Sequence, residues 1–568
     1  MKSSSIPLLI GIVLTIIGLV VGLRVTALDA DAYRGLSWDT GLFTDEGYYM
    51  HNARNVVLFG QTKTDEFNNM LLMPTLHYLQ VAFFKVFGVG LVQTRAISVL
   101  FSLFTLIVFW STLNRAFDER VATVGALFLG LDHVNLLYNR MGLMDTPAAF
   151  MMVCVFYALV RCFSDIDRDD SRERARHRAI FSGVLLGLTY TTRGLGVILF
   201  PAPFLAFWIC KREDYRLDIE ARRILGGIGA GLLGSLSLYF VLWYLPNRSQ
   251  LVYVNHYHLS FQLLPHSISH LIRNVRQALS GQAFLGLAPY LSRYTPVQFS
   301  LVLLLFGAWG FQSKLSSVAR FALLIASLWL LAGWGLFAAV NYAPSRYYVL
   351  VYPAMATLSA VSLVYFSDVW ETLLKRRLAR ACIASFLAFQ WLESALIAVH
   401  HNESVWLLGG TLLVASMAGL APSVASYEHS LPRDWGRTSL LLFVAWAVIN
   451  CGWYTDWWRN LSYTHRSASQ WLAQNLPPNS VLIGDCAPGL CVNNRFRCVN
   501  VIPDLCNDKG TLSRWKSSPT YIAILDGKWK EEWWIDHYPT AVATENRVML
   551  FTRVVSHPVG VYRAYAVR

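Results

Sequence analysis

The sequence predicts a polytopic α-helical membrane protein that carries a C-terminal extracytoplasmic α/β domain. Of its 568 residues, 55% are hydrophobic and only 15% are charged, and the mean hydropathy is +0.41. Apolar runs of about 20 residues, the length that spans a bilayer, recur along the chain. The 20 Trp residues suit a protein whose aromatic rings gather at membrane interfaces. This composition excludes a soluble protein of this size and an intrinsically disordered chain.

The apolar runs predict about thirteen spanning helices. The first run, 6–23, is too long for a removable signal peptide and lacks a small-residue cleavage site. The other predicted spans are 91–113, 121–138, 146–163, 179–192, 195–210, 224–245, 297–312, 321–340, 347–366, 381–399, 405–421 and 438–454.

The basic residues indicate the orientation of these spans. A net charge of +13 would suggest nucleic-acid binding in a soluble protein. Here, however, the basic clusters 172–178, 211–212, 222–223 and 375–380 all fall in short loops on one side of the membrane. By the positive-inside rule that side is cytoplasmic, and the N-terminus lies there too. We therefore expect membrane lipids, and no nucleic acid, as partners.

The predicted topology divides the chain into a transmembrane module, 1–454, and an extracytoplasmic α/β domain, 455–568. The first extracytoplasmic loop, 24–90, is expected to hold two helices that lie on the outer leaflet. Thr44 is expected to cap the first of them, which ends at Gly60. Pro74 is expected to open the second, at 75–87, before Gly88 ends it.

The C-terminal domain combines helical and strand patterns. Residues 467–476 have helical periodicity that stops at Pro477, and strand-like runs follow at 480–483, 521–525, 548–551 and 559–567. The segment from Glu532 to Asp536 is interpreted as an amphipathic core element. Four of the nine cysteines also crowd into this domain: Cys486, Cys491, Cys498 and Cys506.

These four cysteines predict either disulfides in an oxidising compartment or a zinc site in a reducing one. The domain contains no Cys-x-x-Cys pair. We therefore expect disulfides, whose connectivity the sequence leaves open.

Two acidic positions at outer helix ends are candidates for chemistry. Asp45 and Glu46 follow Thr44 at a predicted helix N-terminus. There the helix dipole would keep a carboxylate ionised and able to accept a proton from an attacking hydroxyl. Asp145 lies at the next outside junction, where it could orient an acceptor or a bound cation. Helix capping is the alternative role of each acid.

Several cations lie at the same predicted depth. Guanidinium groups converging on these acids would fit a phosphate group, because their planar forks bind phosphate oxygens. Snorkelling to the interface is the alternative for any single one. His256 forms a His-x-His pair that could bind zinc, although an interfacial polar role is favoured. The candidate cations are Arg54, Lys85, Arg193, Arg273, Arg276 and Arg346.

Short motifs occur in a characteristic order: Asp45-Glu-Gly-Tyr48, Pro74-Thr-Leu-His77, Asn139-Arg140 before Asp145-Thr-Pro147, and Arg346-Tyr-Tyr before Pro353. Over residues 6–366 this order resembles the GT-C glycosyltransferases. It is most similar to the protein O-mannosyltransferase-like and aminoarabinose-transferase-like enzymes of glycosyltransferase family 39 type.

The resemblance implies an inverting glycosyltransferase. Its donor would be a sugar linked to undecaprenyl or dolichyl phosphate, and its acceptor a hydroxyl of a lipid, a glycan or a protein. A bacterial plasma membrane is favoured as its location. No cofactor is certain, and the sequence leaves a divalent cation open.

The resemblance also implies roles for individual residues. Asp45 would be the catalytic base, with Glu46 beside it and Asp145 as the second acid. The donor phosphate would contact Arg346, Arg193, Lys85 and Arg54. The acceptor or substrate pocket would be lined by Tyr48, His77, Tyr347 and His256.

Three rival interpretations remain. A transporter or flippase would place charged residues and broken helices near the bilayer midplane, and Asp132-His133 and Glu393 are the residues of that kind. An oligosaccharyltransferase would carry a Trp-Trp-Asp motif, which is interrupted here as Trp533-Trp-Ile-Asp536. An inactive scaffold is disfavoured by the intact Asp45 and Asp145.

Overall fold

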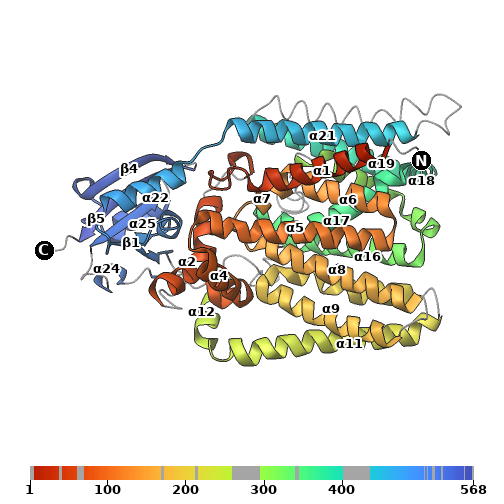
Figure 1. Ribbon diagram of the computed structural model, residues 1–568, viewed down its shortest axis with the longest axis horizontal. Coiled ribbons are helices and arrows are strands. Elements are labelled where there is room, and N and C mark those ends of the chain that lie inside the picture. The colour runs from red at the N-terminus through yellow and green to blue at the C-terminus, as the bar shows by residue number, and fades with distance from the viewer. Residues whose placement is uncertain are drawn as a thin grey trace.

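In the computed structural model, long helices lie side by side and a β-sheet with its own helices packs at one end of them (Figure 1). The C-terminus lies at the sheet end, and the N-terminal helix starts towards the other end. The structure describes residues 5–36, 41–60, 69–167, 172–211, 215–258, 294–339, 344–400, 435–503, 506–507, 510–514, 519–525, 529–555 and 557–565.

The bundle follows the predicted apolar runs closely. Within the described ranges, five helices are long and apolar enough to cross a membrane, or six if one bent pair is a single span. The predicted total of thirteen stays a prediction, and the run 405–421 lies outside the described residues, as do the candidate cations Arg273 and Arg276. The bundle helices are α1 (Ser5–Val25), α5 (Leu91–Ala116), α6 (Glu119–Leu131), α7 (His133–Asn139), α8 (Asp145–Asp167), α9 (Arg172–Thr192), α10 (Pro201–Lys211), α11 (Tyr215–Tyr239), α15 (Pro296–Gly307), α16 (Ser317–Ala339), α17 (Tyr352–Val364), α18 (Phe366–Leu374), α19 (Arg377–His400) and α21 (Trp435–Arg459).

The predicted span 121–138 is not one straight helix, because α6 and α7 meet at an angle of 61°. Asp132 causes the break: its Oδ1 accepts hydrogen bonds from the backbone N–H groups of Val134 and Asn135, so the helix restarts there. The backbone N–H of His133 donates to Oδ1 of Asn450 on α21. These contacts give Asp132 a capping role. The side chain of Glu393 lies outside the described residues.

Short helices of the predicted first outer loop, 24–90, lie between the bundle and the sheet (Figure 1). The first, α2 (Gly41–Phe59), begins one turn earlier than predicted, so Thr44 lies inside the helix and does not cap it. Asp45 is therefore not in the first turn, and the helix dipole is not what stabilises its charge. The second, α4 (Pro74–Phe87), has the predicted bounds, with Pro74 at its start and Gly88 in the left-handed region at φ 82° after its end. The remaining outer helices are α3 (Asn69–Leu72) and α12 (Arg248–His258).

The C-terminal residues form a five-stranded mixed sheet in the order β2-β1-β3-β5-β4. The central strand β1 runs parallel to β2 and β3, whereas β5 runs antiparallel to β3 and β4. Four of these strands coincide with predicted runs, and β2 was not predicted. The elements are α22 (Thr464–Asn475), β1 (Val481–Gly484), α23 (Ala487–Leu490), β2 (Arg497–Asn500), α24 (Thr511–Arg514), β3 (Thr520–Leu525), α25 (Trp529–His537), β4 (Arg547–Val554) and β5 (His557–Tyr565).

The segment 532–536 lies within α25, and only part of it is in the core. Trp534 is buried in the small core on one face of the sheet, whereas Ile535 is exposed. The Trp-Trp pair thus serves packing of the helix on the sheet.

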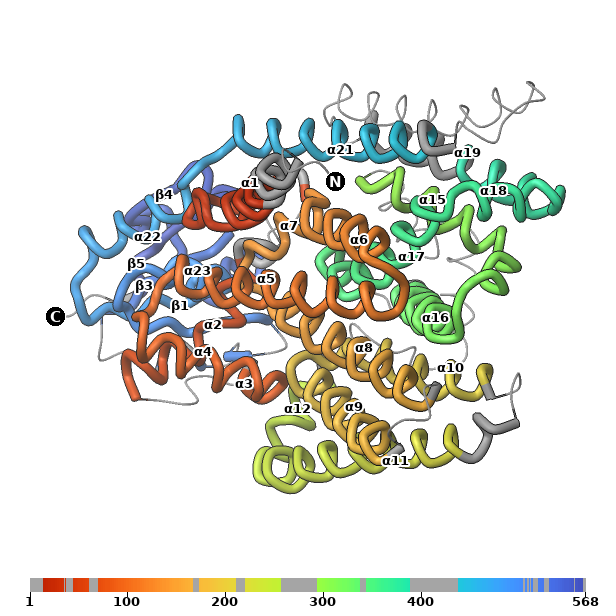
Figure 2. Tube along the Cα trace, turned by 45° about the vertical axis from the view of Figure 1, so that its right-hand side comes forward, coloured from red at the N-terminus to blue at the C-terminus, as the bar shows by residue number. Residues whose placement is uncertain are grey.

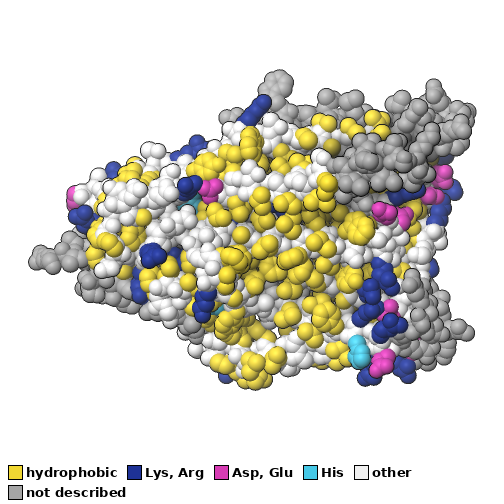
Figure 3. All heavy atoms as spheres, in the orientation of Figure 1, with side chains coloured by type: hydrophobic (Ala, Val, Ile, Leu, Met, Phe, Trp, Pro, Cys, Tyr) yellow, Lys and Arg dark blue, Asp and Glu magenta, His cyan; other side chains and the backbone are white. Residues whose placement is uncertain are grey.

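The surface has the charge distribution of a membrane protein. Hydrophobic side chains cover the middle of the molecule, and many Lys and Arg side chains gather at the end far from the sheet (Figure 3). The basic residues at the start of α9, such as Arg174 and Arg176, are exposed there. This distribution agrees with the predicted cytoplasmic loops.

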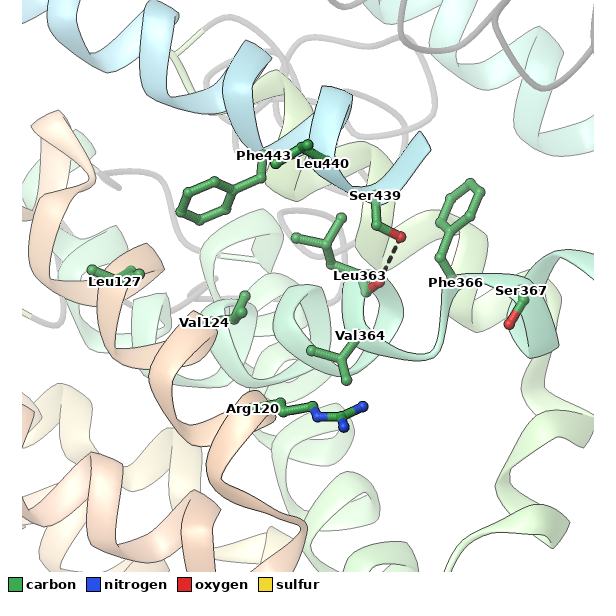
Figure 4. A pocket seen from close by; sticks show the side chains of 10 residues that line it. All are labelled: Arg120, Val124, Leu127, Leu363, Val364, Phe366, Ser367, Ser439, Leu440 and Phe443. Carbon is green, nitrogen blue, oxygen red and sulfur yellow. Dashed lines mark hydrogen bonds between the residues drawn. The ribbon is translucent and has the colours of Figure 1, made fainter. Parts of the chain in front are cut away.

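An open pocket of about 500 Å³ lies on the bundle at that same end, far from the sheet. Among its described lining residues Arg120 carries the one charge, and the hydroxyl of Ser439 donates to the backbone oxygen of Leu363 at 3.1 Å (Figure 4). None of the predicted functional residues lines it. The lining residues are Arg120, Val124, Leu127, Leu363, Val364, Phe366, Ser367, Ser439, Leu440 and Phe443.

Asp31, in the first outer loop, anchors the sheet region to the bundle. Its carboxylate accepts hydrogen bonds from Ser462, from the backbone and hydroxyl of Thr464, and from the backbone N–H of His465, at 2.6–2.9 Å. It therefore satisfies the open N–H groups in the first turn of α22. Burial alone would raise the pKa of Asp31, but these hydrogen bonds outweigh burial and lower it from 3.8.

Replacing Asp31 by Asn should reduce stability in a pH-dependent manner. The loss should be about 1–2 kcal/mol at neutral pH, as for a lost helix cap. Because the folded pKa lies below the unfolded one, the stabilisation is complete above about pH 4 and is lost as the pH falls through the folded value. Unfolding of the wild type and Asp31→Asn, measured from pH 7 downwards, should show two curves that converge in acid. A difference in unfolding free energy between the two proteins that stayed the same at every pH would contradict this explanation.

Candidate active site

Two buried ion pairs lie at the end of the bundle that meets the sheet region. Nη1 of Arg346 is 2.8 Å from Oδ2 of Asp45, and Nε of Arg193 is 2.8 Å from Oδ1 of Asp145. The side chains of Arg193 and Asp145 are only 3% and 1% exposed. Charged groups so deeply buried are costly unless they are paired, so each acid holds its arginine in place.

Tyr347 joins the two pairs into one cluster. The guanidinium carbons of Arg193 and Arg346 lie 4.6 Å and 5.2 Å from the centre of its ring. Tyr49 lies in the same electrostatic environment: burial, and then the charge of Asp45, raise the pKa of its hydroxyl, which stays protonated. The site thus combines two carboxylates, two guanidinium groups and two tyrosines.

Four separate segments supply the charged groups. Asp45 lies in the second turn of α2, and Asp145 is the first residue of α8. Arg193 has an extended backbone between α9 and the short 3-10 helix η2 (Gly194–Leu199). Arg346 lies in the 3-10 helix η6 (Ser345–Leu350) that precedes α17. Asp145, Arg193 and Arg346 thus lie at helix starts or breaks, and α2 brings Asp45 to them, although the four residues are far apart along the chain.

Glu46 does not join this cluster, contrary to the prediction that it assists the base. Its two oxygens accept bonds from Nε and Nη2 of Arg95 at 2.8 Å and 2.6 Å, and Oε1 also accepts from the backbone N–H of Gly142 at 2.7 Å. Arg95 in turn donates to the backbone oxygens of Leu28 and Ala30. Glu46 is thus a structural link between α2, α5 and the loop before Asp145.

The turn around α23 of the C-terminal region packs directly on α2, next to the cluster (Figure 2). The hydroxyl of Tyr48 donates to the backbone oxygen of Asp485 at 2.8 Å. Nη2 of Arg54 donates to the backbone oxygens of Asn494 and Phe496 at 2.9 Å and 2.7 Å. Tyr48 and Arg54, predicted for the pocket and the phosphate, therefore serve to dock the sheet region.

Gly47 makes the closest approach in this contact. A Cβ at this position would lie 2.4 Å from the backbone nitrogen of Gly489, so no side chain fits without separating the two elements. We expect Gly47→Ala to lower stability by about 1–3 kcal/mol, as overpacking does. Thermal unfolding checks this. Gly226→Ala is the matched control, since its added Cβ meets nothing within 4 Å, and an equal loss in both variants would contradict the account.

Three other predicted residues lie outside the charged cluster. Lys85 is exposed in the last turn of α4, and His256 is exposed on α12. His77 is buried on α4, and burial, with a smaller contribution from His51, lowers its pKa to about 4. His77 is therefore a neutral imidazole at pH 7.

The four C-terminal cysteines are thiols in the structure, so the predicted disulfides are not formed. All four are buried in the protein core. Their sulfur atoms pack against polar groups: Cys506 donates to the backbone oxygen of Asn500, and Nη1 of Arg54 lies 3.8 Å from Sγ of Cys498. Burial raises the pKa of the Cys491 thiol well above its ordinary value, which keeps it protonated.

The residues described contain no group of three or more His, Cys, Asp or Glu side chains placed to hold a metal ion. The two acids of the cluster face guanidinium groups instead.

Sequence reasoning did not find Tyr49 or Arg95. Tyr49 lies one helical turn after Asp45, so helical spacing could have found it. No pattern in the sequence identifies Arg95 as the partner of Glu46.

The chain is similar to known proteins in part of its sequence and in its fold. A family model described as dolichyl-phosphate-mannose-protein mannosyltransferase matches residues 73–245. No curated protein matches the chain in sequence.

Among solved structures, the chain is similar to ArnT from Cupriavidus metallidurans. The apo form gives a TM-score of 0.58 at 17% identity, covering 98% of each chain. The form bound to undecaprenyl phosphate gives 0.56 at 16% identity, covering 97% of this chain and 98% of that one. The archaeal oligosaccharyltransferase AglB from Archaeoglobus fulgidus is less similar, with a TM-score of 0.48 at 12% identity over 90% of this chain and 69% of that one. The similarity to ArnT shows that the chain has the fold of that protein, as the resemblance to GT-C enzymes implies.

Proposed function

Because the chain has the GT-C fold, we propose that it is an integral membrane glycosyltransferase that uses a polyprenyl-phosphate-linked sugar. The charged cluster is its active site, and the N-terminus is cytoplasmic, so that transfer occurs on the outer face. The acceptor is a hydroxyl of a lipid, a glycan or a protein. Undecaprenyl phosphate bound to the similar ArnT supports this choice of donor class.

The observation that best supports the proposal is an unused hydrogen-bond donor on the side chain of Arg193. Its Nη1 atom is buried and makes no hydrogen bond with any residue that the structure describes. A guanidinium with an unused donor, beside a second guanidinium at Arg346, fits an anionic group that is absent from the protein itself. The phosphate of a lipid-linked donor has that charge and would enter at this depth.

The reaction would begin when Arg346 exchanges its ion pair with Asp45 for contacts with the donor phosphate. When the donor phosphate binds, Arg346 turns to its oxygens, and Asp45 becomes available to accept a proton. The acceptor oxygen then attacks the anomeric carbon from the side opposite the phosphate, and its proton moves to Asp45 as the new bond forms. The bond between the anomeric carbon and the phosphate oxygen breaks, and polyprenyl phosphate leaves with the bonding electrons.

The two arginines would contribute most in the transition state. A phosphodiester carries one negative charge, and the departing phosphate monoester gains more charge as the bond breaks. Fixed guanidinium groups therefore stabilise the transition state more than the bound donor, which is the condition for catalysis. Throughout the transfer, the ion pair with Asp145 keeps Arg193 in position.

Binding of polyprenyl phosphate by the purified protein tests this proposal. Arg193→Gln should weaken binding about tenfold or more, since hydrogen bonds to charged groups contribute about 1.5–3 kcal/mol. Arg193→Lys, which keeps the charge beside Asp145, should weaken it less. Arg466→Gln is the matched control, because Arg466 is exposed and pairs with Asp29. Unchanged binding by a folded Arg193→Gln would contradict the proposal.

A further inference from the structure

A group of buried polar side chains on α2 and α4 has hydrogen-bonding capacity that the described protein does not use. Oδ1 of Asn52 and Oε1 of Gln80 are buried, and neither accepts a hydrogen bond from any described residue. The residues themselves are only 2% and 3% exposed, and His77 is 4% exposed. Buried carbonyl oxygens without partners are rare in native proteins, and they call for a ligand or ordered water.

These side chains lie close to one another. The helices α2 and α4 pack together, and Phe84, one turn after Gln80, shares a core with Met50 and Ala53 of α2. The side chain of Asn52 lies 3.5 Å from the ring of His51, and His51 is near enough to His77 to affect its ionisation. Asn52, His77 and Gln80 thus belong to one polar region, which we call the amide–imidazole wall.

The amide–imidazole wall adjoins the charged cluster. Asn52 follows Asp45 by seven residues and Tyr49 by three, so all three lie on one face of α2. The helix α4 also contacts the segment that carries Arg193. The hydroxyl of Thr75 on α4 is hydrogen bonded at 2.8 Å to that of Thr191 on α9, and Thr191 precedes Arg193 by two residues. The wall therefore extends from the site where the proposed donor's phosphate and anomeric carbon would lie.

The chemistry of the wall is neutral. Asn52 and Gln80 carry amides, and His77 is an uncharged imidazole with one donor and one acceptor nitrogen. Such groups match hydroxyls, which donate and accept at once. An amino sugar would need a carboxylate here and an acidic sugar a cation, and the wall offers neither; the nearby acids Asp45 and Asp145 already face arginines.

We infer that Asn52, His77 and Gln80 bind hydroxyl groups of the donor's sugar, and that this sugar is a neutral, hydroxyl-rich one. This inference rests on the proposed function. It goes further by assigning the sugar class and the residues that select it. In this role the three side chains determine specificity and take no part in proton transfer.

The test compares lipids that differ only in the sugar. Equilibrium binding is measured for polyprenyl phosphate alone and for its mannose, glucose, amino-sugar and uronic-acid derivatives. The wild type should bind a neutral-sugar donor at least about tenfold more tightly than polyprenyl phosphate. Gln80→Leu and Asn52→Ala should abolish that difference and leave the affinity for polyprenyl phosphate itself within about twofold. Gln474→Leu, on the exposed face of α22, is the control.

Introducing a carboxylate into the amide–imidazole wall should change which donor sugar the protein binds more tightly. Gln80→Glu keeps an acceptor oxygen and adds a negative charge that an ammonium group could meet, so it should favour the amino-sugar donor over the neutral one. A role of Gln80 in folding alone would not produce this shift.

Two sets of results would overturn the inference. One is a wild type that binds neutral-sugar donors no better than polyprenyl phosphate, or prefers a charged sugar. The other is a Gln80→Leu variant that loses affinity for all of these lipids equally, which would indicate a structural role. If none of the lipids binds the folded wild type, the proposed function itself fails and the inference fails with it.

Discussion

Asp45→Asn is expected to lower the turnover number by about 10²- to 10⁴-fold, the usual contribution of a general base. The amide has nearly the same shape as the carboxylate but cannot accept the acceptor's proton. Binding of polyprenyl phosphate should persist, because Arg193 and Arg346 keep their charges. The measurement is the initial rate of polyprenyl phosphate release, together with equilibrium binding of the same lipid.

Asp29→Asn is the matched control for this experiment. Asp29 also lies in the first outer loop and pairs with an arginine, Arg466, but that pair is exposed. Its replacement should change the rate by less than about twofold, since exposed ion pairs contribute little. A folded Asp45→Asn variant that retained a rate within about threefold of the wild type would exclude Asp45 as the base.

Arg95→Met is expected to lower the free energy of unfolding by about 3–5 kcal/mol, because it leaves Glu46 as an unpaired charge in the protein interior. Both side chains of this pair are only 3% exposed. The backbone oxygens of Leu28 and Ala30 would lose a donor at the same time. Thermal or denaturant unfolding in detergent measures the loss.

The comparison for Arg95 is an exposed pair in the same chain. Arg223 is bonded to Glu220 at 2.9 Å, with its side chain 64% exposed. Arg223→Met should change stability by about 0.5 kcal/mol or less, as measured for surface pairs. Similar losses at both positions would show that the bidentate contact with Glu46 is not a main source of stability.

The boundaries of several elements follow from local chemistry and could be predicted. Pro74 and Gly88 delimit α4 because proline suits the first helical position and glycine tolerates the left-handed conformation after the last one. The strand β2 was missed because its four residues, Arg497 to Asn500, lack a pattern of their own. It is recognisable only by its pairing with β1.

Candidate residues could be identified from sequence, but their partners could not. The pairing of Asp45 with Arg346 depends on how α2 and η6 meet in space, and no local pattern contains that information. The separation of Asp45 from Glu46 could have been foreseen. Consecutive residues of an α-helix point about 100° apart, so only one of them can face the cluster. The structure shows that the second, Glu46, faces Arg95.

In the proposed reaction, the cluster around Asp45 and Arg193 cleaves a polyprenyl-phosphate sugar. The most direct test measures free polyprenyl phosphate released by the purified protein from a panel of polyprenyl-phosphate sugars, in the presence of candidate acceptors. The account predicts release from at least one donor, and its loss in Asp45→Asn. No release from any donor by folded protein, or release that does not depend on Asp45, would contradict it.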